Sequence, residues 1–571
     1  MEVEGHLVFV MVGGWLVLAA FVLATWTRIN TVKAWRLGAL GVTLGFSLIH
    51  QLVFSTVAED AFITFRYSLN MTEGNGPAFN PGERVEGYSN FLWMILIAMP
   101  KALFGWDIVV TASVLGVLCT LACVVLAYLL VNRIVAVANP AEPAGGMPAL
   151  GIAAAVLTAG ASGLAAYGPS GLETPLFLLL VLCVCFALVA RRPVVAGVLV
   201  ALVGMTQPDG LVIAVVAGLW LLVAAIRHRH SWWAPVAYLL SAIVFAVPWT
   251  AWRMTYYQHL LPNAVAVKDG GSLGWQLNQG WRYLWEFSLV HPGFLLLGLV
   301  AAAAFLHRRN PDEQEAEARS LVWLLFAITL VYLAFVTYAG GDGMPAWRLL
   351  APVPPLIAVA SVAAYGVLTA PSMASGAPPT SPRAHRRDTR LVPVIALGLA
   401  GASLLVTLAN PNMLDRMHDW RFRIAQMEEI GAWLGASLQP GTVISTYANG
   451  ALSYRAGTQM LVVDVLGLTD EHIARDGKRD ENAGPIGHIA SDYAYVVNVR
   501  RPTVAVTTDN GYSGKQHCAI DPVYAGKYQV ATFRREGTQN WIALYLRGQE
   551  AATLIADLDK DPRFVYVACP A

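Results

Sequence analysis

The chain has 571 residues, of which 56% are hydrophobic and only 13% are charged. Soluble globular proteins carry about 25% charged residues, so this composition excludes an ordinary soluble enzyme, a disordered chain and a nucleic-acid binder. The 38 basic and 37 acidic residues nearly balance, so only the distribution of charge along the chain can indicate partners.

Apolar runs occur from the N-terminus to residue 408. Because a bilayer core needs about 20 apolar residues in a helix, these runs predict twelve membrane spans, of which the sixth and seventh could also form one broken helix. The first run follows no basic segment, so we expect a membrane helix there rather than a signal peptide. The predicted spans are 7–26, 37–57, 108–131, 149–167, 175–190, 194–206, 210–226, 234–250, 291–306, 320–338, 349–369 and 391–408.

The loops between the predicted spans form two sets that differ in charge. Alternate loops together hold fifteen Lys and Arg residues, and the remaining loops within the membrane part hold seven. Cytoplasmic loops are enriched in Lys and Arg, so the first set is predicted to be cytoplasmic. The N-terminus and everything after residue 409 then face outward. Two outer-face loops, 58–107 and 251–290, are long, and the apolar stretch 91–103 in the first is expected to be a re-entrant or interfacial helix.

The composition changes after residue 408, where polar residues become frequent. Apolar residues at helical spacing predict an amphipathic helix over 424–434. We therefore predict two domains: an all-α membrane domain, 1–408, with about 11–12 spans, and an α/β or α+β domain on the outer face, 409–571. Short apolar runs in the second domain predict buried strands at 443–446, 460–463, 503–507 and 541–546.

Two of the six cysteines, Cys518 and Cys569, lie in this outer domain. Cysteines outside the cytosol usually pair, so a disulfide between them is expected, with two unpaired thiols as the alternative. The other four cysteines lie inside apolar runs and are interpreted as small packing residues.

Two adjacent carboxylates, Glu59 and Asp60, directly follow the second predicted span. Ionisable groups close to the bilayer are costly, and they are therefore candidates for function. One carboxylate could act as a general base that takes a proton from an attacking hydroxyl. The other could raise the pKa of its neighbour by like-charge repulsion or bind a hydroxyl of the acceptor. The structural alternative is that both acids stabilise the N-terminus of a helix.

The segment 59–93, with Phe-Asn-Pro-Gly-Glu-Arg-Val-Glu-Gly at 79–87, resembles the first outer loop of a family of bacterial membrane glycosyltransferases. These proteins have the GT-C fold and use polyprenyl-phosphate sugars, and the family includes the terminal β-(1→2)-arabinofuranosyltransferases of mycobacterial arabinan synthesis. Further motifs in this chain are similar to family motifs and follow in the same order, at 170–174, 207–210, 253–268, 340–348 and 464–488.

The resemblance implies a GT-C enzyme of the bacterial plasma membrane with its active site on the periplasmic face. It implies transfer of arabinofuranose from a polyprenyl-phosphoryl donor to a hydroxyl of a cell-envelope glycan, with Asp60 as general base. No cofactor is expected, although a divalent cation held by acidic residues remains open. The alternatives are transfer of another sugar, such as mannose, and a lipid-linked sugar transporter or flippase. The outer domain is also a candidate for binding the acceptor glycan.

The reaction needs groups that stabilise a departing phosphate, and fixed cations on the outer face suit this role. The candidates for donor-phosphate binding are Arg348, Lys268, Arg253 and Arg66, with Arg84 as a further basic residue on that face. The structural alternative is that basic side chains extend toward lipid headgroups. The candidates for sugar or acceptor binding are Asp342, Glu173, Asn263 and Tyr257. The two acids could instead cap a turn or a helix, and the tyrosine could belong to an interfacial aromatic belt.

The chain departs from the family pattern at three places. Glu59 stands where an aspartate is usual, which makes Asp60 the better candidate for the base. Gln207 stands where an arginine is usual, so phosphate contact is not expected there. The N-terminal helix 7–26 is an addition to the usual plan. His50 and His488 have no partner at metal-binding spacing, so no metal ligand set is predicted.

Overall fold

The computed structural model describes residues 2–139, 147–267, 271–307, 313–369, 391–480, 489–507 and 511–570. The chain divides into two compact units, which we call the membrane unit and the sheet unit. The membrane unit comprises residues 1–55, 113–249 and 276–417, and the sheet unit comprises residues 56–112, 250–275 and 418–571. This division differs from the expected domains 1–408 and 409–571, because parts of both long outer loops group with the C-terminal sheet.

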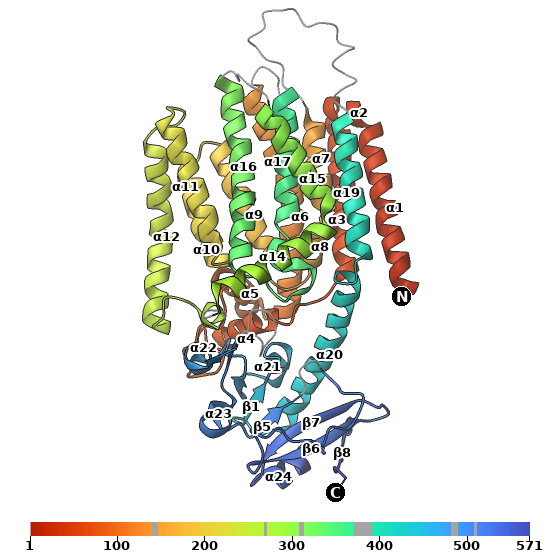
Figure 1. Ribbon diagram of the computed structural model, residues 1–571, viewed down its shortest axis with the longest axis vertical. Helices are drawn as coiled ribbons and strands as arrows, with labels where there is room; N and C mark the ends of the chain where they lie inside the picture. Colours follow the sequence, from red (N-terminus) through yellow and green to blue (C-terminus); the bar gives the residue numbers. More distant parts are fainter. Residues whose placement is uncertain are drawn as a thin grey trace, which may run out of the picture. The chain divides into compact units, whose positions relative to one another are not determined.

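Helices make up the membrane unit (Figure 1). They lie in it wholly or in part, and their bounds are α1 (Glu2–Ala24), α2 (Trp26–Thr31), α3 (Lys33–Phe54), α6 (Ile108–Ala138), α7 (Pro148–Ala159), α8 (Ser162–Tyr167), α9 (Thr174–Val189), α10 (Pro193–Thr206), α11 (Gly210–Ile226), α12 (Trp233–Tyr257), α14 (Leu273–Val290), α15 (Pro292–His307), α16 (Glu313–Tyr338), the 3-10 helix η2 (Pro345–Leu350), α17 (Val353–Thr369) and α19 (Leu391–Ala409).

A helix lies over each of the twelve predicted spans. Among the described residues, seven helices are long and apolar enough to cross a bilayer, or eight if α14 and α15, which bend by 94° at their break, count as one span. The helices α7, α9, α10 and α11 are shorter, with 12 to 17 residues. Since a full crossing needs about 20 residues, length alone supports fewer crossings than the twelve expected. The fold is nevertheless polytopic and helical, as predicted.

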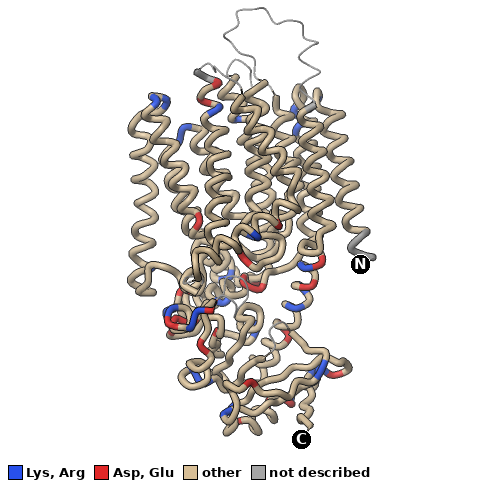
Figure 2. The backbone as a smooth tube through the Cα atoms, in the orientation of Figure 1, with Lys and Arg blue, Asp and Glu red and all other residues tan. Residues whose placement is uncertain are grey.

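Close backbone approach holds the membrane unit together. At Gly280 on α14, a Cβ would lie 1.8 Å from the carbonyl oxygen of Thr337 on α16. At Gly293 on α15, a Cβ would lie 2.0 Å from the carbonyl oxygen of Leu399 on α19. Small residues allow such contacts between membrane helices, where no hydrophobic effect drives association. The middle stretches of these helices carry few charged residues, and Lys and Arg gather toward one end of them (Figure 2).

The sheet unit contains a six-stranded sheet of order β2-β1-β5-β7-β6-β8 and a two-stranded ribbon, β3-β4 (Figure 1). Strand β1 pairs in parallel with β2 and β5, and the remaining pairs are antiparallel. The strands are β1 (Val443–Thr446), β2 (Leu461–Asp464), β3 (Lys478–Arg479), β4 (Ala490–Ser491), β5 (Val504–Val506), β6 (Tyr528–Arg535), β7 (Trp541–Arg547) and β8 (Phe564–Val567).

The helices of the sheet unit come from three parts of the chain. They are α4 (Ala61–Thr72), α5 (Phe91–Phe104), α13 (Asn263–Ala266), α20 (Leu414–Ser437), α21 (Ala451–Ala456), α22 (Glu471–Asp476), α23 (Tyr493–Tyr495), η3 (Val496–Arg500) and α24 (Ala551–Leu558). The predicted loop 251–290 is thus largely helical, and its second half, α14, belongs mainly to the membrane unit.

The four predicted strands are confirmed, and the helix predicted over 424–434 is part of α20. Trp433 of this helix stacks on Phe564 of β8 at 4.2 Å between ring centroids, so α20 packs against the sheet. Strands β6 and β8 were not predicted: β6 is interrupted by Gln, Thr and Arg residues, and β8 has only four residues. The predicted apolar stripe of α20 is buried as expected, at Ile424, Met427, Ile430 and Leu434.

The first outer loop is built onto the edge strand β2. The side-chain amide of Asn80 donates to the carbonyl oxygen of Val462 (2.8 Å) and accepts from its N–H (2.9 Å). An edge strand leaves such groups unpaired, and the asparagine supplies the missing neighbour. Tyr67 and Tyr257 share one buried cluster with Val462. Segments far apart in the sequence therefore form a single core with the sheet.

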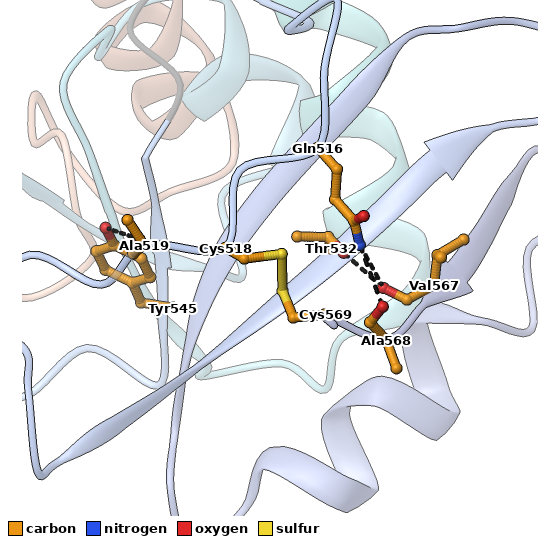
Figure 3. Close-up of a disulfide and its surroundings, with 8 residues drawn as sticks. All are labelled: Gln516, Cys518, Ala519, Thr532, Tyr545, Val567, Ala568 and Cys569. Atoms are coloured by element: carbon orange, nitrogen blue, oxygen red, sulfur yellow. Dashed lines mark hydrogen bonds between the residues drawn. A yellow bond between two sulfur atoms is a disulfide. The ribbon is translucent and has the colours of Figure 1, made fainter. Parts of the chain in front are cut away.

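A disulfide joins Cys518 to Cys569 and ties the segment after β5 to the end of the chain (Figure 3). Beside it, the amide of Gln516 donates to Thr532 Oγ1 (2.8 Å) and to the carbonyl oxygen of Ala568 (3.2 Å). The two constraints together fix the path of the chain at this edge of the sheet.

Candidate active site

The two adjacent carboxylates have different partners. Asp60 is the N-cap residue of α4, but its side chain makes no cap hydrogen bond to that helix. The Glu59 carboxylate instead contacts the start of α21, where Oε1 accepts from the N–H of Gly450 (2.5 Å) and of Ala451 (3.3 Å). Asp60 therefore makes no cap hydrogen bond to α4, and the Glu59 carboxylate is hydrogen-bonded to the N-terminus of α21.

The electrostatics of this pair follow from its surroundings. Burial raises the pKa of Glu59 to about 8, and the negative charges of Asp60 and Asp464 act in the same direction. The pKa of Asp464, at the end of β2, rises to about 7 through burial. Glu59 is thus mostly protonated near neutral pH, so Asp60 stands beside a neutral acid rather than a second negative charge. Asp464 begins the motif at 464–488, but no role was assigned to it from the sequence, because its burial beside Glu59 depends on the fold.

The contacts of Arg66 favour a structural role over the predicted phosphate binding. This side chain is fully buried, and its guanidinium donates to four backbone carbonyl oxygens. An arginine has five N–H donors, so little of it is left for a ligand. Arg66 instead fixes the first outer loop to the segment before β2. The accepting carbonyls belong to Phe79, Ser453, Gly457 and Met460.

Arg253 forms a bidentate ion pair with Glu86. Its Nε lies 2.7 Å from Oε1 and its Nη2 lies 2.6 Å from Oε2. The side chains are 8% and 5% exposed, respectively. A buried charge needs such a partner, so the pair argues against a phosphate role for Arg253. Glu86 was not selected from the sequence, although it lies in the first outer motif.

Tyr257 is hydrogen-bonded inside the core of the sheet unit. Its hydroxyl donates to the carbonyl oxygen of Pro77 (2.7 Å) and lies 3.0 Å from the hydroxyl of Tyr88. Only 2% of its surface is exposed, so these contacts favour a packing role over the predicted sugar binding. The neighbouring candidate Asn263 is equally buried, but its Nδ2 has no hydrogen-bond partner among the described residues, and its sugar-binding role stays a prediction.

In the membrane unit, Asp342 and Arg348 form an ion pair. Arg348 Nε lies 3.1 Å from Asp342 Oδ2, and Asp342 Oδ1 accepts from the N–H of Met344 at 3.3 Å. The backbone between them is strained, because Ala346 and Trp347 have φ of 57° and 49°. Such conformations are costly for residues other than glycine and often occur at functional sites. Asp342 thus closes a turn, as one alternative proposed, and also orients the arginine.

A second polar group lies close to this pair in the membrane unit. Glu173 accepts a hydrogen bond from the amide of Gln207 (2.9 Å) and does not cap α9. Asp209 accepts from the hydroxyl of Tyr332 (2.9 Å). Burial raises the pKa of Asp209 to about 6, with the charge of Glu173 raising it further and that of Arg348 lowering it. Glu173, Asp209 and Arg348 come from three motifs that are distant in sequence, and they are therefore close enough to interact electrostatically.

The remaining predicted residues give less information about the site. Lys268 and His488 lie outside the described residues. Arg84 lies over the ring of Tyr256, with its guanidinium carbon 4.9 Å from the centroid. His50 is buried, and its Nδ1 lies 3.0 Å from the carbonyl oxygen of Ala159, which is a structural contact. Across the described ranges, no group of three or more His, Cys, Asp or Glu residues could hold a metal ion.

The fold is that of a GT-C membrane protein. The chain is similar in structure to ArnT from Cupriavidus metallidurans bound to undecaprenyl phosphate, with a TM-score of 0.53 and 14% sequence identity, over 90% of this chain and 98% of that one. ArnT in the apo state gives a TM-score of 0.52 and 12% identity, over 89% of this chain and 98% of that one.

Two curated proteins carry the resemblance noted in the sequence. The terminal β-(1→2)-arabinofuranosyltransferase of Corynebacterium glutamicum is 26% identical over 55% of this chain and 48% of its own length. The one of Mycobacterium tuberculosis is 29% identical over 45% of this chain and 42% of its own length. The matches thus span about half the length of these relatives. Residues 416–545 match a family model described as a domain of unknown function, DUF8728.

Proposed function

We propose that this chain is a membrane glycosyltransferase that transfers arabinofuranose from a polyprenyl-phosphoryl donor to a hydroxyl of a cell-envelope arabinan. The observation that carries the proposal is the arrangement of the two adjacent carboxylates. Asp60 does not cap its helix, and Glu59 is bonded to Gly450 and has a pKa of about 8. The similarity to two arabinofuranosyltransferases supports the choice of sugar.

In this proposal Asp60 is the general base. A carboxylate can accept the proton of an acceptor hydroxyl as that hydroxyl attacks the sugar. A neutral Glu59 spares Asp60 the repulsion of an adjacent negative charge. The acceptor oxygen then forms the new glycosidic bond while the bond from the sugar to the lipid phosphate breaks.

The polar residues of the membrane unit are assigned to the donor. Arg348, oriented by Asp342 at 3.1 Å, would stabilise the departing phosphate, together with Lys268. Glu173 and Asp209 carry carboxylates that can bind sugar hydroxyls. No cofactor is part of the proposal.

We place the site on the periplasmic face of a bacterial plasma membrane. The distribution of Lys and Arg among the loops supports this orientation. The disulfide between Cys518 and Cys569 also supports it, because disulfides persist mainly in oxidising compartments.

The test is a transfer assay with the purified full-length chain in detergent, one arabinan acceptor and synthetic polyprenyl-phosphoryl donors that differ only in the sugar. We expect product with the arabinofuranosyl donor. Product with only a mannosyl donor would overturn the assignment of arabinofuranose as the transferred sugar. Absence of product with every donor, together with donor movement across the bilayer of reconstituted vesicles, would overturn the enzyme in favour of a flippase. Product in micelles, where no second compartment exists, would exclude a pure transporter.

A further inference from the structure

A groove of about 570 Å³ lies within the C-terminal part of the sheet unit, and none of the residues that line it is assigned to catalysis above. Its volume is typical of a site for a small molecule or a segment of a chain, about 300–1,000 Å³. The described residues that line it are Asp419, Phe422, Arg423, Gln426, Thr507, Gly511, Tyr512, Ser513, Lys515, His517, Ala519, Trp541, Ala543 and Tyr545. All of them fall inside the range 416–545 matched by the domain model.

One wall is a single face of α20. Its lining residues stand at positions 419, 422, 423 and 426, which is the spacing of one helical face. The ring of Phe422 is 64% exposed, although this residue lies on a helix whose other face is buried. Asp419 and Arg423 pair at 2.8 Å on the same wall, so their charges largely cancel.

The floor is one face of β7. Trp541, Ala543 and Tyr545 alternate along the strand and therefore point to the same side. Tyr545 is held in place, because its hydroxyl donates to the carbonyl oxygen of Ala519 (3.2 Å) and accepts from the N–H of Asp521 (3.1 Å). Figure 3 shows Tyr545 and Ala519 beside the disulfide.

The opposite wall is the segment 511–519, which is fixed at both ends. Ser513 exchanges two backbone hydrogen bonds of 2.8 Å with Trp541. Cys518 is joined to Cys569. Between these ties, Lys515 and His517 are exposed along the groove. A preformed wall lowers the cost of ordering the site when a ligand binds.

The lining combines flat aromatic faces with hydrogen-bonding groups and little net charge. Phe422, Tyr512 and Trp541 offer apolar faces on which the C–H faces of sugar rings can lie. Tyr545 is buried and forms part of the floor beneath them. Gln426, Thr507, Ser513 and Lys515 offer donors and acceptors for hydroxyl groups. This lining matches an uncharged, extended ligand in which every ring has both an apolar C–H face and polar hydroxyl groups.

We infer that the groove between α20, β7 and segment 511–519 binds an uncharged oligosaccharide, a stretch of the acceptor glycan remote from the hydroxyl that reacts. This inference rests on the proposed function for the identity of the glycan, but the binding itself requires no transfer. The groove would hold the enzyme on a long acceptor and raise the local concentration of acceptor ends.

The test measures binding directly, with the full-length chain in detergent and a synthetic arabinofuranose hexasaccharide, by isothermal titration and saturation-transfer NMR without any donor. We expect binding by the wild type, and at least a tenfold loss of affinity in Phe422→Ala and in Trp541→Ala. Tyr493→Ala, which removes a half-exposed aromatic residue of the same domain outside the groove, should bind as the wild type does. Because Phe422 is exposed, its variant should also unfold at the wild-type temperature.

The outcomes separate this inference from the proposed function. The inference that the groove binds the oligosaccharide is overturned if hexasaccharide binding survives both groove substitutions, or if the wild type does not bind. Binding of sulfated oligosaccharides in preference to neutral ones also overturns it. Binding that depends on the groove in a protein with no transfer activity would retain the groove and reject the transferase. If transfer occurs, Phe422→Ala should raise the KM for a long acceptor and leave kcat with a disaccharide acceptor unchanged.

Discussion

Oε1 of Glu59 accepts a hydrogen bond from the backbone N–H of Gly450, 391 residues later in the chain. This contact joins the start of the first outer loop to the N-terminus of α21. The Glu59 carboxylate is thus hydrogen-bonded to the backbone of α21, whereas the Asp60 side chain makes no cap hydrogen bond to α4.

Gly450→Ala should break this contact. A Cβ at residue 450 would lie 2.1 Å from the carbonyl oxygen of Glu59 and 2.6 Å from its Oε1. Overpacking of this kind costs about 1–3 kcal/mol, so we expect a lower unfolding temperature in detergent. Gly514→Ala is the matched control, since a Cβ there meets nothing within 4 Å. Equal unfolding temperatures for the two variants would show that the contact is not formed.

Glu59→Gln should reduce the pH dependence of stability. The pKa of Glu59 is about 8 in the folded chain against 4.5 ordinarily, so between these values the folded chain holds a proton that the unfolded chain has lost. Stability from this group is therefore complete at the acid end and declines as pH rises toward 8. Glutamine is neutral throughout. Thermal unfolding between pH 5 and 8.5 should show a smaller decline in the variant, and identical declines would refute the raised pKa.

Arg66→Met should destabilise the protein rather than weaken donor binding. The substitution leaves four backbone carbonyl acceptors without their donors, and each buried unsatisfied group costs about 1–3 kcal/mol. Arg84→Met, at an exposed position in the same loop, is the control and should unfold nearly as the wild type does. A well-folded Arg66→Met variant that binds polyprenyl phosphate poorly would restore the phosphate role and reject the structural one.

The Arg253–Glu86 pair predicts strong coupling in a double-mutant cycle. Glu86→Gln alone leaves a buried guanidinium without its counter-charge, which costs about 3–5 kcal/mol. The double variant Glu86→Gln with Arg253→Met removes both charges and should lose less than the two single variants combined. The measurement is denaturant unfolding of all four proteins. Additive losses would mean that the two side chains do not interact.

Much of the fold follows from the sequence, because apolar runs and helical periodicity act locally. Every predicted span carries a helix, and the four short apolar runs after residue 408 are strands. By length alone, seven or eight helices among the described residues can cross a bilayer fully, fewer than the twelve predicted spans, since residue runs do not show where a helix ends early. Near residue 160, for example, an apolar run that looks continuous is broken into α7 and α8.

The candidate site was harder to predict, because the fate of a charged side chain depends on distant partners. Arg66 and Arg348 have the same side chain and both lie in outer-face motifs. One is buried among carbonyl groups more than 380 residues away, and the other pairs with an acid six residues before it. No local pattern distinguishes the two fates. The same holds for Tyr257, whose burial depends on the fold of the first outer loop.

The most direct test of the central claim is the rate of sugar transfer by Asp60→Asn, with Asp107→Asn as an Asp-to-Asn control in the same outer segment. Loss of a general base lowers a rate by about 10²–10⁴-fold, so Asp60→Asn should lose at least a hundredfold in kcat while its unfolding temperature and its affinity for polyprenyl phosphate stay at wild-type values. Asp107→Asn should keep its activity. Wild-type turnover in a folded Asp60→Asn protein would contradict the account.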